Sequence, residues 1–258
     1  MSDGRTHLSV EGNIAHISFD RPQARNAMTW KMYDELAEAC EVIGAQPQIR
    51  VAVLRGAGGR AFIAGTDIEQ FKAFTSGEDG VAYEKKVDAY IRAVETLPVP
   101  TLAIVEGWAV GGGLAIANAC DIRIATPGAR FGVPIAATLG NCLSAANIRR
   151  LLSTLGEGWV KRMLVLAEMP TAEDLAPSGY VAAVVAPDAL DAHVIDLCER
   201  LCGHAPLTMR AARQAVLRIV QTGAIADEDI VRGVYGSEDF REGVSAFSEK
   251  RKALWRGR

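Results

Sequence analysis

The stretch Gly107-Trp108-Ala109-Val110-Gly111-Gly112-Gly113-Leu114-Ala115 combines an apolar strand end, a glycine turn and the first turn of a helix. The first N–H groups of a helix have no partner within it, so such a turn can hold an anion with backbone donors. The following turn offers only Leu114, Ala115 and Ile116, and none of these side chains can transfer a proton. The stretch therefore predicts an anion site that has no acid or base on its own helix.

Composition sets the broad class. The 258 residues are 49% hydrophobic and 23% charged, which is typical of a globular chain with a sizeable core. The net charge of −3 gives no general attraction for nucleic acid. We find no signal-peptide run in residues 1–12 and no apolar stretch long enough to span a membrane. The five scattered cysteines indicate reduced thiols in a cytoplasmic protein.

Two of these cysteines, Cys198 and Cys202, are four residues apart on a predicted helix, with His193 and His204 nearby. Their spacing matches no common zinc pattern. We favour a half-buried helix face over a metal site and expect no metal.

The chain alternates between strand and helix patterns over its first two thirds. Strands are predicted at residues 14–20, 51–54, 61–65, 101–106, 121–125 and about 129–133. Helices are predicted from Thr29 to about Gly44, at about 67–74, from about Gly80 to Thr96, and from the triple glycine to Ala119. The recurrence of strand, strand and helix predicts a layered α/β core.

Helical patterns dominate the last third. A helix is expected from Ala145, another starts at Thr171, and a short strand is expected at 181–185. Beyond Pro187 the whole chain is predicted to be helical, ending in a helix over 239–256. We therefore divide the chain into a core, residues 1–195, and a helical C-terminal region, residues 196–258.

Two further glycine-containing segments bear on function. Gly56-Ala57-Gly58-Gly59 follows a strand but lacks the Lys-Ser/Thr of a phosphate-binding loop, so we interpret it as a plain turn. In Ala64-Gly65-Thr66-Asp67-Ile68, Gly65 allows a tight turn and Asp67 can cap the following helix. An N–H near Thr66 would then point outwards. If this segment meets Gly112 in the fold, two backbone donors would form an oxyanion hole.

Four segments carry a family resemblance: residues 21–28, 61–68, 107–122 and 240–251. In these segments the chain resembles the crotonase (enoyl-CoA hydratase/isomerase) superfamily. The resemblance implies a spiral of ββα units, a helical C-terminal trimerisation region, and a homotrimer or a dimer of trimers. It also implies an acyl-CoA ligand, with coenzyme A as part of the substrate and no prosthetic group.

The same resemblance implies roles for particular residues. The thioester oxygen would lie between the N–H groups of Thr66 and Gly112. The CoA nucleotide would run along the segments that contain Ala24, Arg25, Ala64, Asp67 and Ile68. The resemblance implies that Lys250 reaches a CoA phosphate, either in its own subunit or in a neighbouring one. The alternative is that Lys250 is one cation of the solvated charged run 249–252.

The chain departs from the hydratases of this family at two positions. They place one glutamate on the helix after the glycines, where this sequence has Ala115. The second glutamate falls on Ile135 or Ala136 of the segment 131–140. Hydration needs a base for water and an acid for the α-carbon, and losing such a group costs roughly 10²–10⁴-fold in rate. We therefore do not expect efficient hydration by the usual two-glutamate route.

Substitute groups are sought nearby. Thr138 and Asn141 could orient water or a carbonyl, and Cys142 could transfer protons if its pKa were lowered, although a small buried residue is the commoner role. Four residues of the predicted pocket wall are further candidates, although exposed helix carboxylates are usually only solvated: Glu69, Tyr83, Glu84 and Asp88. Asp67 and Asp121 are interpreted as structural caps or as acceptors for backbone N–H groups. An apolar pocket is predicted from Ile63, Phe71, Phe74, Ile135 and Leu139.

The family resemblance implies an acyl-CoA-processing enzyme that stabilises a thioester enolate, and the residues at the two glutamate positions imply a non-standard or absent acid–base pair. Hydration and isomerisation both remain open as the net reaction. A catalytically inactive acyl-CoA binder and an acyl-CoA thioester hydrolase are the alternatives.

Overall fold

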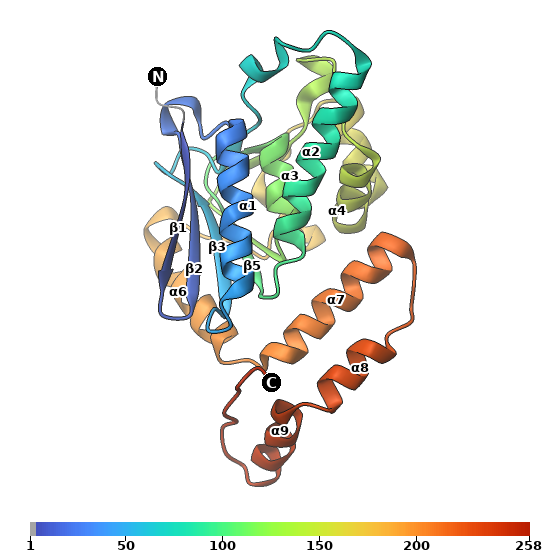
Figure 1. Cartoon of the computed structure of the whole chain (residues 1–258). Coiled ribbons are helices and arrows are strands. Elements are labelled where there is room, and N and C mark those ends of the chain that lie inside the picture. The colour runs from blue at the N-terminus through green and yellow to red at the C-terminus, as the bar shows by residue number, and fades with distance from the viewer. Residues whose placement is uncertain (1–3) are drawn as a thin grey trace.

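The computed structural model describes residues 4–258, which form a layered α/β fold (Figure 1). Within these residues the main sheet has six strands, ordered β1-β2-β3-β5-β7-β9. They are β1 (Arg5–Glu11), β2 (Ile14–Asp20), β3 (Val51–Gly56), β5 (Thr101–Val105), β7 (Ile122–Ala125) and β9 (Ala183–Val184). β1 and β2 form an antiparallel hairpin, and the other neighbours pair in parallel. The antiparallel strand β1 is an element that the sequence patterns did not reveal.

A second, smaller sheet carries the candidate site. Its strands are β4 (Ile63–Ala64), β6 (Trp108–Val110) and β8 (Arg130–Gly132), all parallel. The chain adds one strand to the main sheet, one to the small sheet and then a helix, and does so three times. The three helices are α2 (Gly77–Glu95), α3 (Gly112–Ala119) and α4 (Ala145–Val165). This recurrence confirms the predicted ββα spiral.

Residues of the main sheet alternate between two cores, as the period of a strand requires. Ala52, Leu54 and Val105 face the larger core, which they share with α1 (Trp30–Ala45), α2 and α3. Val53 and Ile104 face the opposite side, where α6 (Pro187–Cys202) packs. Both faces of the sheet are thus covered, which explains why its central strands are continuous apolar runs.

Several predicted helix boundaries are confirmed, and the prediction of a helix over residues 67–74 is wrong. Thr29 caps α1, since its Oγ1 accepts a hydrogen bond from the N–H of Met32 at 3.3 Å. The helix expected over 67–74 is only a single 3-10 turn, η2 (Ile68–Phe71). The turn cannot continue as a longer helix because the next helix begins just after it. The Asp79 carboxylate caps the start of that helix by accepting the N–H groups of Thr75 and Ser76 at 2.8 Å. For the same reason α2 begins at Gly77, before the expected Gly80.

The C-terminal region is helical but ends differently from the prediction. It contains α7 (Pro206–Thr222), α8 (Glu228–Tyr235) and α9 (Glu238–Ser248), which form an arm at one end of the molecule (Figure 1). The arm is joined to the core through α7, where Arg213 pairs with Asp121 and Gln221 bonds Glu95. The helix predicted over 239–256 stops at Ser248, and Lys250 adopts a positive φ of 55°. The last residues instead fold back on α9, where the Asp239 carboxylate accepts the N–H groups of Arg256 and Gly257. The expected boundary after residue 195 falls within α6.

The remaining short elements are three further 3-10 turns and one helix. They are η1 (Pro22–Ala24), η3 (Pro134–Ala137), α5 (Ala172–Leu175) and η4 (Ala176–Ser178). Thr171 begins α5 as predicted and forms a reciprocal capping box with Asp174. No helix within residues 4–258 is long and apolar enough to cross a membrane.

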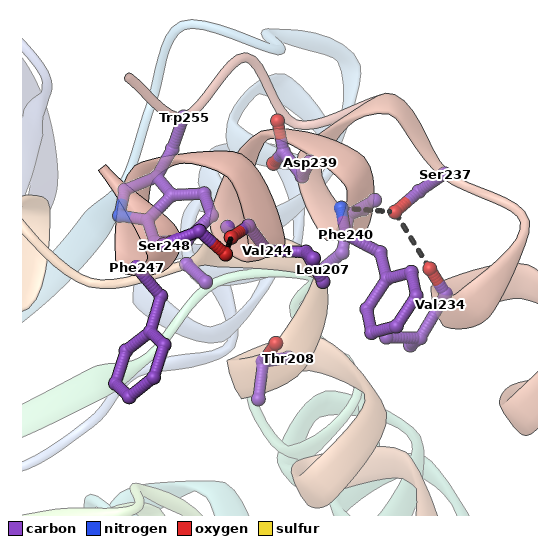
Figure 2. Close-up of a pocket in the computed structure, with 12 residues that line it drawn as sticks. Leu207, Thr208, Val234, Ser237, Asp239, Phe240, Val244, Phe247, Ser248 and Trp255 are labelled. Carbon is purple, nitrogen blue, oxygen red and sulfur yellow. Dashed lines mark hydrogen bonds between the residues drawn. The ribbon is translucent and has the colours of Figure 1, made fainter. Parts of the chain in front are cut away.

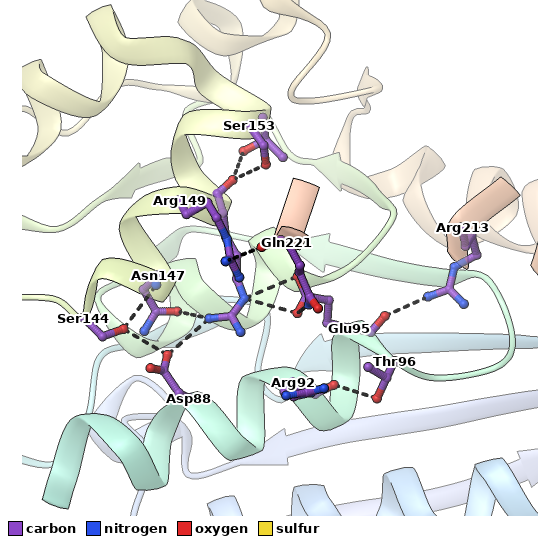
Figure 3. A network of polar contacts seen from close by, with 12 residues as sticks. Asp88, Arg92, Glu95, Thr96, Ser144, Asn147, Arg149, Ser153, Arg213 and Gln221 are labelled. Atoms are coloured by element: carbon purple, nitrogen blue, oxygen red, sulfur yellow. Dashed lines mark hydrogen bonds and ion pairs between the residues drawn. The ribbon is translucent and has the colours of Figure 1, made fainter. Parts of the chain in front are cut away.

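A buried arginine joins α2 to α4. Arg150 of α4 bonds Asp88 at 3.2 Å, Glu95 at 3.3 Å and the side-chain oxygen of Asn147 at 3.0 Å (Figure 3). Gln221 at the end of α7 also reaches Glu95, at 3.0 Å. A buried cation needs such partners, since leaving either sign unpaired is costly. The network fixes α2 against α4, and the candidate pocket lies between these helices.

The contact between α3 and β4 provides a test of the fold. A Cβ on Gly113 would overlap the backbone oxygen of Ile63 and lie 2.7 Å from its Cβ. We expect Gly113→Ala to lower the free energy of unfolding by about 1–3 kcal/mol or more, because neither backbone can yield. Urea unfolding measures this change.

The matched control is Gly158→Ala in α4, where a Cβ would meet nothing within 4 Å. That variant should be neutral or more stable by up to about 1 kcal/mol, since alanine favours helix. Equal stability of the two variants would contradict the packing described.

Candidate active site

A cavity of about 260 Å³ lies where the small sheet meets α2, α3 and the segment leading into α4. Its walls are formed by residues 64–68, by α2 around Tyr83 and Glu84, by the glycine turn before α3, and by residues 133–147. Most of the lining is apolar. Few polar groups reach it, as is usual for sites that bind small organic molecules.

The two predicted donor segments meet at this cavity. β4 and β6 pair in parallel, with Ala64 opposite Val110, so the turns that follow both strands lie side by side. A Cβ on Gly112 would lie 3.2 Å from the Oγ1 of Thr66. Gly112 is also the first residue of α3, where the N–H groups have no partner within the helix.

The backbone of Thr66 is oriented by Met28. The N–H of Met28 donates to the Gly65 oxygen and the Met28 oxygen accepts the N–H of Asp67, both at 2.9 Å. Because backbone groups alternate in direction along an extended segment, the N–H of Thr66 itself points away from Met28. Thr66 lines the cavity. The geometry therefore brings both predicted donors to one place.

A cluster of hydroxyl groups surrounds Thr66. Its Oγ1 lies 2.9 Å from the Tyr33 hydroxyl and accepts a hydrogen bond from the Tyr83 hydroxyl at 3.1 Å. Burial raises the pKa of both tyrosines, so both phenols stay neutral at ordinary pH. The Tyr33 oxygen also fills the space beside Gly112, because a Cβ there would overlap it. Sequence reasoning missed Tyr33, which has no motif of its own.

Of the three residues at the expected glutamate positions, two line the cavity. Ala115 and Ile135 both line it with apolar side chains. Ala136 is exposed and is not among the lining residues described.

A carboxylate does reach the cavity, from another helix. Glu84 of α2 is half-buried in the wall, and its Oε2 accepts the N–H of Ser144 at 2.8 Å. Burial raises the pKa of this carboxyl, the Ser144 N–H lowers it, and the nearby charge of Asp88 raises it again. Glu84 thus differs from the solvated helix carboxylate that the sequence led us to expect.

The other candidates on the pocket wall have different surroundings. Asp88 is bonded to Arg150 and to the Ser144 hydroxyl, at 3.2 and 3.0 Å. Glu69 is exposed and pairs with Lys72 at 2.7 Å. Neither lines the cavity formed by the described residues.

The proposed substitute residues lie at the mouth of the cavity. Thr138 and Asn141 line it and are exposed, and the Thr138 hydroxyl donates to the Pro134 oxygen at 2.9 Å. Cys142 is exposed, which contradicts the small buried residue favoured for it, and it is not among the lining residues described. Of the predicted apolar residues, Phe71, Ile135 and Leu139 line the cavity. Ile63 is instead fully buried in the core, and Phe74 packs against Phe71 and Tyr83.

The residues predicted to follow the CoA nucleotide form a continuous strip beside the cavity. The Arg25 oxygen accepts the N–H of Ala64 at 3.0 Å, which joins the segment containing Ala24 and Arg25 to β4. Ala64 and Ile68 also line the cavity. Asp67 caps η2 through the N–H of Glu69 and pairs with Arg21 at 2.7 Å, as a structural role predicts.

Asp121 and Lys250 lie apart from this strip. Asp121 also has the predicted structural role, since its carboxylate accepts the N–H of Thr101 at 2.7 Å. Lys250 follows α9, and in Figure 1 this helix lies at the opposite end of the molecule from α2 and α3, which line the cavity.

The cysteine pair, Cys198 and Cys202, packs between α6 and the main sheet. Cys198 is buried in the core beneath the sheet, and Cys202 is partly buried beside it. Within residues 4–258 no group of three or more His, Cys, Asp or Glu side chains could hold a metal ion.

Comparisons with known proteins agree with this fold. The family model described as "Enoyl-CoA hydratase/isomerase" matches residues 9–258. The short-chain-enoyl-CoA hydratase of Clostridium acetobutylicum is 32% identical over 249 residues, covering 95% of each chain. The (E)-benzylidenesuccinyl-CoA hydratase of Thauera aromatica is 32% identical over 263 residues, covering 97% of this chain and 98% of its own.

A solved structure extends the likeness to three dimensions. The enoyl-CoA hydratase/carnithine racemase from Magnetospirillum magneticum superposes with a TM-score of 0.91 at 32% identity, covering 98% of this chain and 96% of that one. The crotonase-type resemblance of the sequence is thereby confirmed over almost the whole chain, and the protein belongs to the enoyl-CoA hydratase/isomerase family.

Proposed function

We propose that this protein is an acyl-CoA-processing enzyme that holds the thioester oxygen between the backbone N–H groups of Thr66 and Gly112. The observation that carries the proposal is the parallel pairing of β4 with β6, which brings the two turns together. Two converging backbone donors stabilise negative charge on a thioester oxygen as an enolate forms, and they act more strongly where water is excluded. Two relatives whose names denote CoA hydratases, a short-chain-enoyl-CoA hydratase and an (E)-benzylidenesuccinyl-CoA hydratase, support this class of substrate.

The CoA part of the substrate would follow the strip that contains Ala24, Arg25, Ala64, Asp67 and Ile68. This strip leads directly into the cavity, since Ala64 and Ile68 belong to both. The acyl group would then lie against Ala115 and Ile135. We propose that Lys250 contributes a cation to the CoA phosphates from a neighbouring subunit, because in its own chain it is remote from the cavity.

We propose that the reaction includes proton transfer at the acyl chain and that groups other than two glutamates perform it. The positions that the resemblance assigns to those glutamates hold Ala115 and Ile135 or Ala136, none of which transfers protons. Isomerisation through an enolate needs one group that removes and returns a proton, and hydration needs an activated water molecule in addition. A panel of acyl-CoA thioesters separates these reactions from the alternatives: release of free thiol would indicate a hydrolase, and binding without turnover an inactive binder.

The role of the Gly112 N–H can be tested with a matched pair of variants. A Cβ at position 112 would overlap the Tyr33 hydroxyl but lie 3.6 Å from its Cζ, so Tyr33→Phe makes room for it. In that background we compare Gly112→Ala, which keeps the N–H, with Gly112→Pro, which removes it. Proline is tolerated at the first position of a helix.

We expect Gly112→Pro to lower acyl-CoA turnover by roughly 10²–10³-fold relative to Gly112→Ala, as for other lost oxyanion donors. Steady-state turnover on the best substrate of the panel measures the difference. Similar rates for the two variants would show that this N–H does not hold the oxyanion.

We also propose that the arm assembles with other copies of the chain, as a trimer or a dimer of trimers. Its helices expose large apolar side chains, including Val216 at 62%, Tyr235 at 64% and Phe247 at 88%. Figure 2 shows Phe240, Val244, Phe247 and Trp255 around an open cavity of about 390 Å³ on this arm. An apolar surface of this kind usually marks an interface between proteins.

The assembly prediction concerns Phe247. We expect Phe247→Glu to shift the mass in sedimentation from an oligomer towards the monomer, because a charge would be buried in the interface. Lys252→Glu, an exposed residue of the same region, should leave the oligomer intact. A wild-type protein that sediments as a monomer at micromolar concentration would contradict this assembly.

A further inference from the structure

We propose that Glu84 of α2 is the acid–base residue of this pocket, which removes a proton from the bound acyl group and returns it. The proposal rests on the proposed function, because it needs a thioester held at Thr66 and Gly112. It assigns proton transfer to a residue of α2. The family resemblance placed the proton-transferring glutamates at positions 115 and 135 instead, on other elements.

The composition of the cavity wall is the first argument. Among the described residues that line it, Glu84 is the single carboxylate, and Tyr83 is the single other titratable group. The remaining polar lining groups are Thr66, Thr138, Asn141 and Asn147, which can form hydrogen bonds but do not gain or lose a proton near neutral pH. A proton carried within this pocket therefore has one evident acceptor.

The second argument is that nothing neutralises this carboxylate. One helical turn away, Asp88 is paired with Arg150. Glu84 forms no ion pair among residues 4–258, and its hydrogen bond to the Ser144 N–H engages Oε2. A carboxylate buried without a cation keeps basicity that an ion-paired one loses, because burial disfavours the charged form.

The third argument is positional. Glu84 directly follows Tyr83, whose hydroxyl donates to the Thr66 side chain at 3.1 Å. The N–H of Thr66 is one of the two proposed oxyanion donors, so α2 contacts the residue that would hold the thioester oxygen. The Ser144 N–H anchors Glu84 from the opposite side, at the start of α4. Hydrogen bonds thus link α2, which carries Glu84, both to Thr66 and to the start of α4.

The proton transfer balances with this one residue. The Glu84 carboxylate takes a proton from the acyl carbon next to the thioester carbonyl, and the electron pair of that C–H bond moves onto the carbonyl oxygen as an enolate. The neutral carboxyl then returns the proton. Return to the same carbon restores the thioester, whereas in a β,γ-unsaturated chain return to the γ-carbon moves the double bond into conjugation. No water, oxidant or reductant is consumed, and the substrate class is an unsaturated acyl thioester.

The surroundings define the expected pH dependence. The titratable groups around Glu84 are Tyr83 and Asp88 on α2 and Tyr33 on α1, and α4 presents Ser144, Asn147 and the Arg150 that is paired with Asp88. Both tyrosines have raised pKa values and stay neutral. The base works when Glu84 is ionised, so activity should fall as pH drops through a pKa above the ordinary glutamate range.

The experiment follows exchange of the α-protons of butyryl-CoA in D₂O by mass spectrometry, together with conversion of 3-butenoyl-CoA to crotonyl-CoA. Glu84→Gln keeps the size and can still accept the Ser144 N–H. It should slow both reactions by roughly 10²–10⁴-fold, with little change in the Kd for butyryl-CoA, and should abolish the acidic limb of the pH profile. Glu69→Gln changes an exposed carboxylate of η2 that does not line the cavity, and this variant should match the wild type.

Glu84→Asp provides a second readout if the glutamine variant is poorly folded. It retains a carboxylate one methylene shorter, and we expect a reduced rate with the acidic limb preserved. Exchange by Glu84→Gln within about threefold of the wild type would overturn the proposal, as would wild-type protein that binds butyryl-CoA without exchanging its protons. Failure of the wild type to bind any acyl-CoA would instead overturn the proposed function itself.

Discussion

The candidate site depends on the parallel pairing of β4 with β6. These two short strands end at the same edge, so the turns that follow them, at Thr66 and Gly112, are brought together by backbone hydrogen bonds. The approach is close enough to exclude side chains: a Cβ on Gly113 would overlap the Ile63 backbone, and one on Gly112 would overlap the Tyr33 hydroxyl. Gly112 and Gly113 therefore satisfy the packing as well as the anion site, whereas Gly111 is favoured by its positive φ of 54°.

The polar groups of the pocket are divided between its two sides. The backbone donors belong to the small sheet and α3, and the titratable side chains belong to α2. Tyr83 connects these sides through its hydrogen bond to Thr66, while the Arg150 network holds α2 against α4. Charge stabilisation and proton transfer are thus assigned to separate elements, and this division allows Ala115 and Ile135 to be apolar without leaving the pocket free of a carboxylate.

Local patterns predicted much of the fold. The continuous apolar runs of β3 and β5, the Thr29 cap of α1 and the capping box at Thr171 are readable from a few neighbouring residues. The antiparallel strand β1 was missed although the Gly12-Asn13 turn before β2 is a hairpin signal. The helix expected over 67–74 failed because the Ser76–Asp79 capping box starts a new helix directly after it.

The backbone donors of the candidate site were predicted singly from the sequence, whereas Glu84 was only one of four candidates on the pocket wall and Tyr33 was missed. Glycine turns reveal donors at Thr66 and Gly112, and the family resemblance pairs them. Glu84 and Tyr33 come from α2 and α1 and reach the site through tertiary packing, which leaves no local pattern in the sequence. Burial by tertiary packing raises the pKa of Glu84, and the N–H that bonds its carboxylate and lowers that pKa comes from Ser144, which is distant in the sequence.

The most direct measurement is a crystal structure with a bound acyl-CoA thioester. Our account predicts that the thioester oxygen lies roughly 2.7–3.1 Å from the backbone nitrogens of both Thr66 and Gly112. The acyl chain should lie against Ala115 and Ile135, with the Glu84 carboxylate facing its α-carbon. A thioester oxygen bound away from these two nitrogens, or an acyl chain directed out of the cavity, would contradict it.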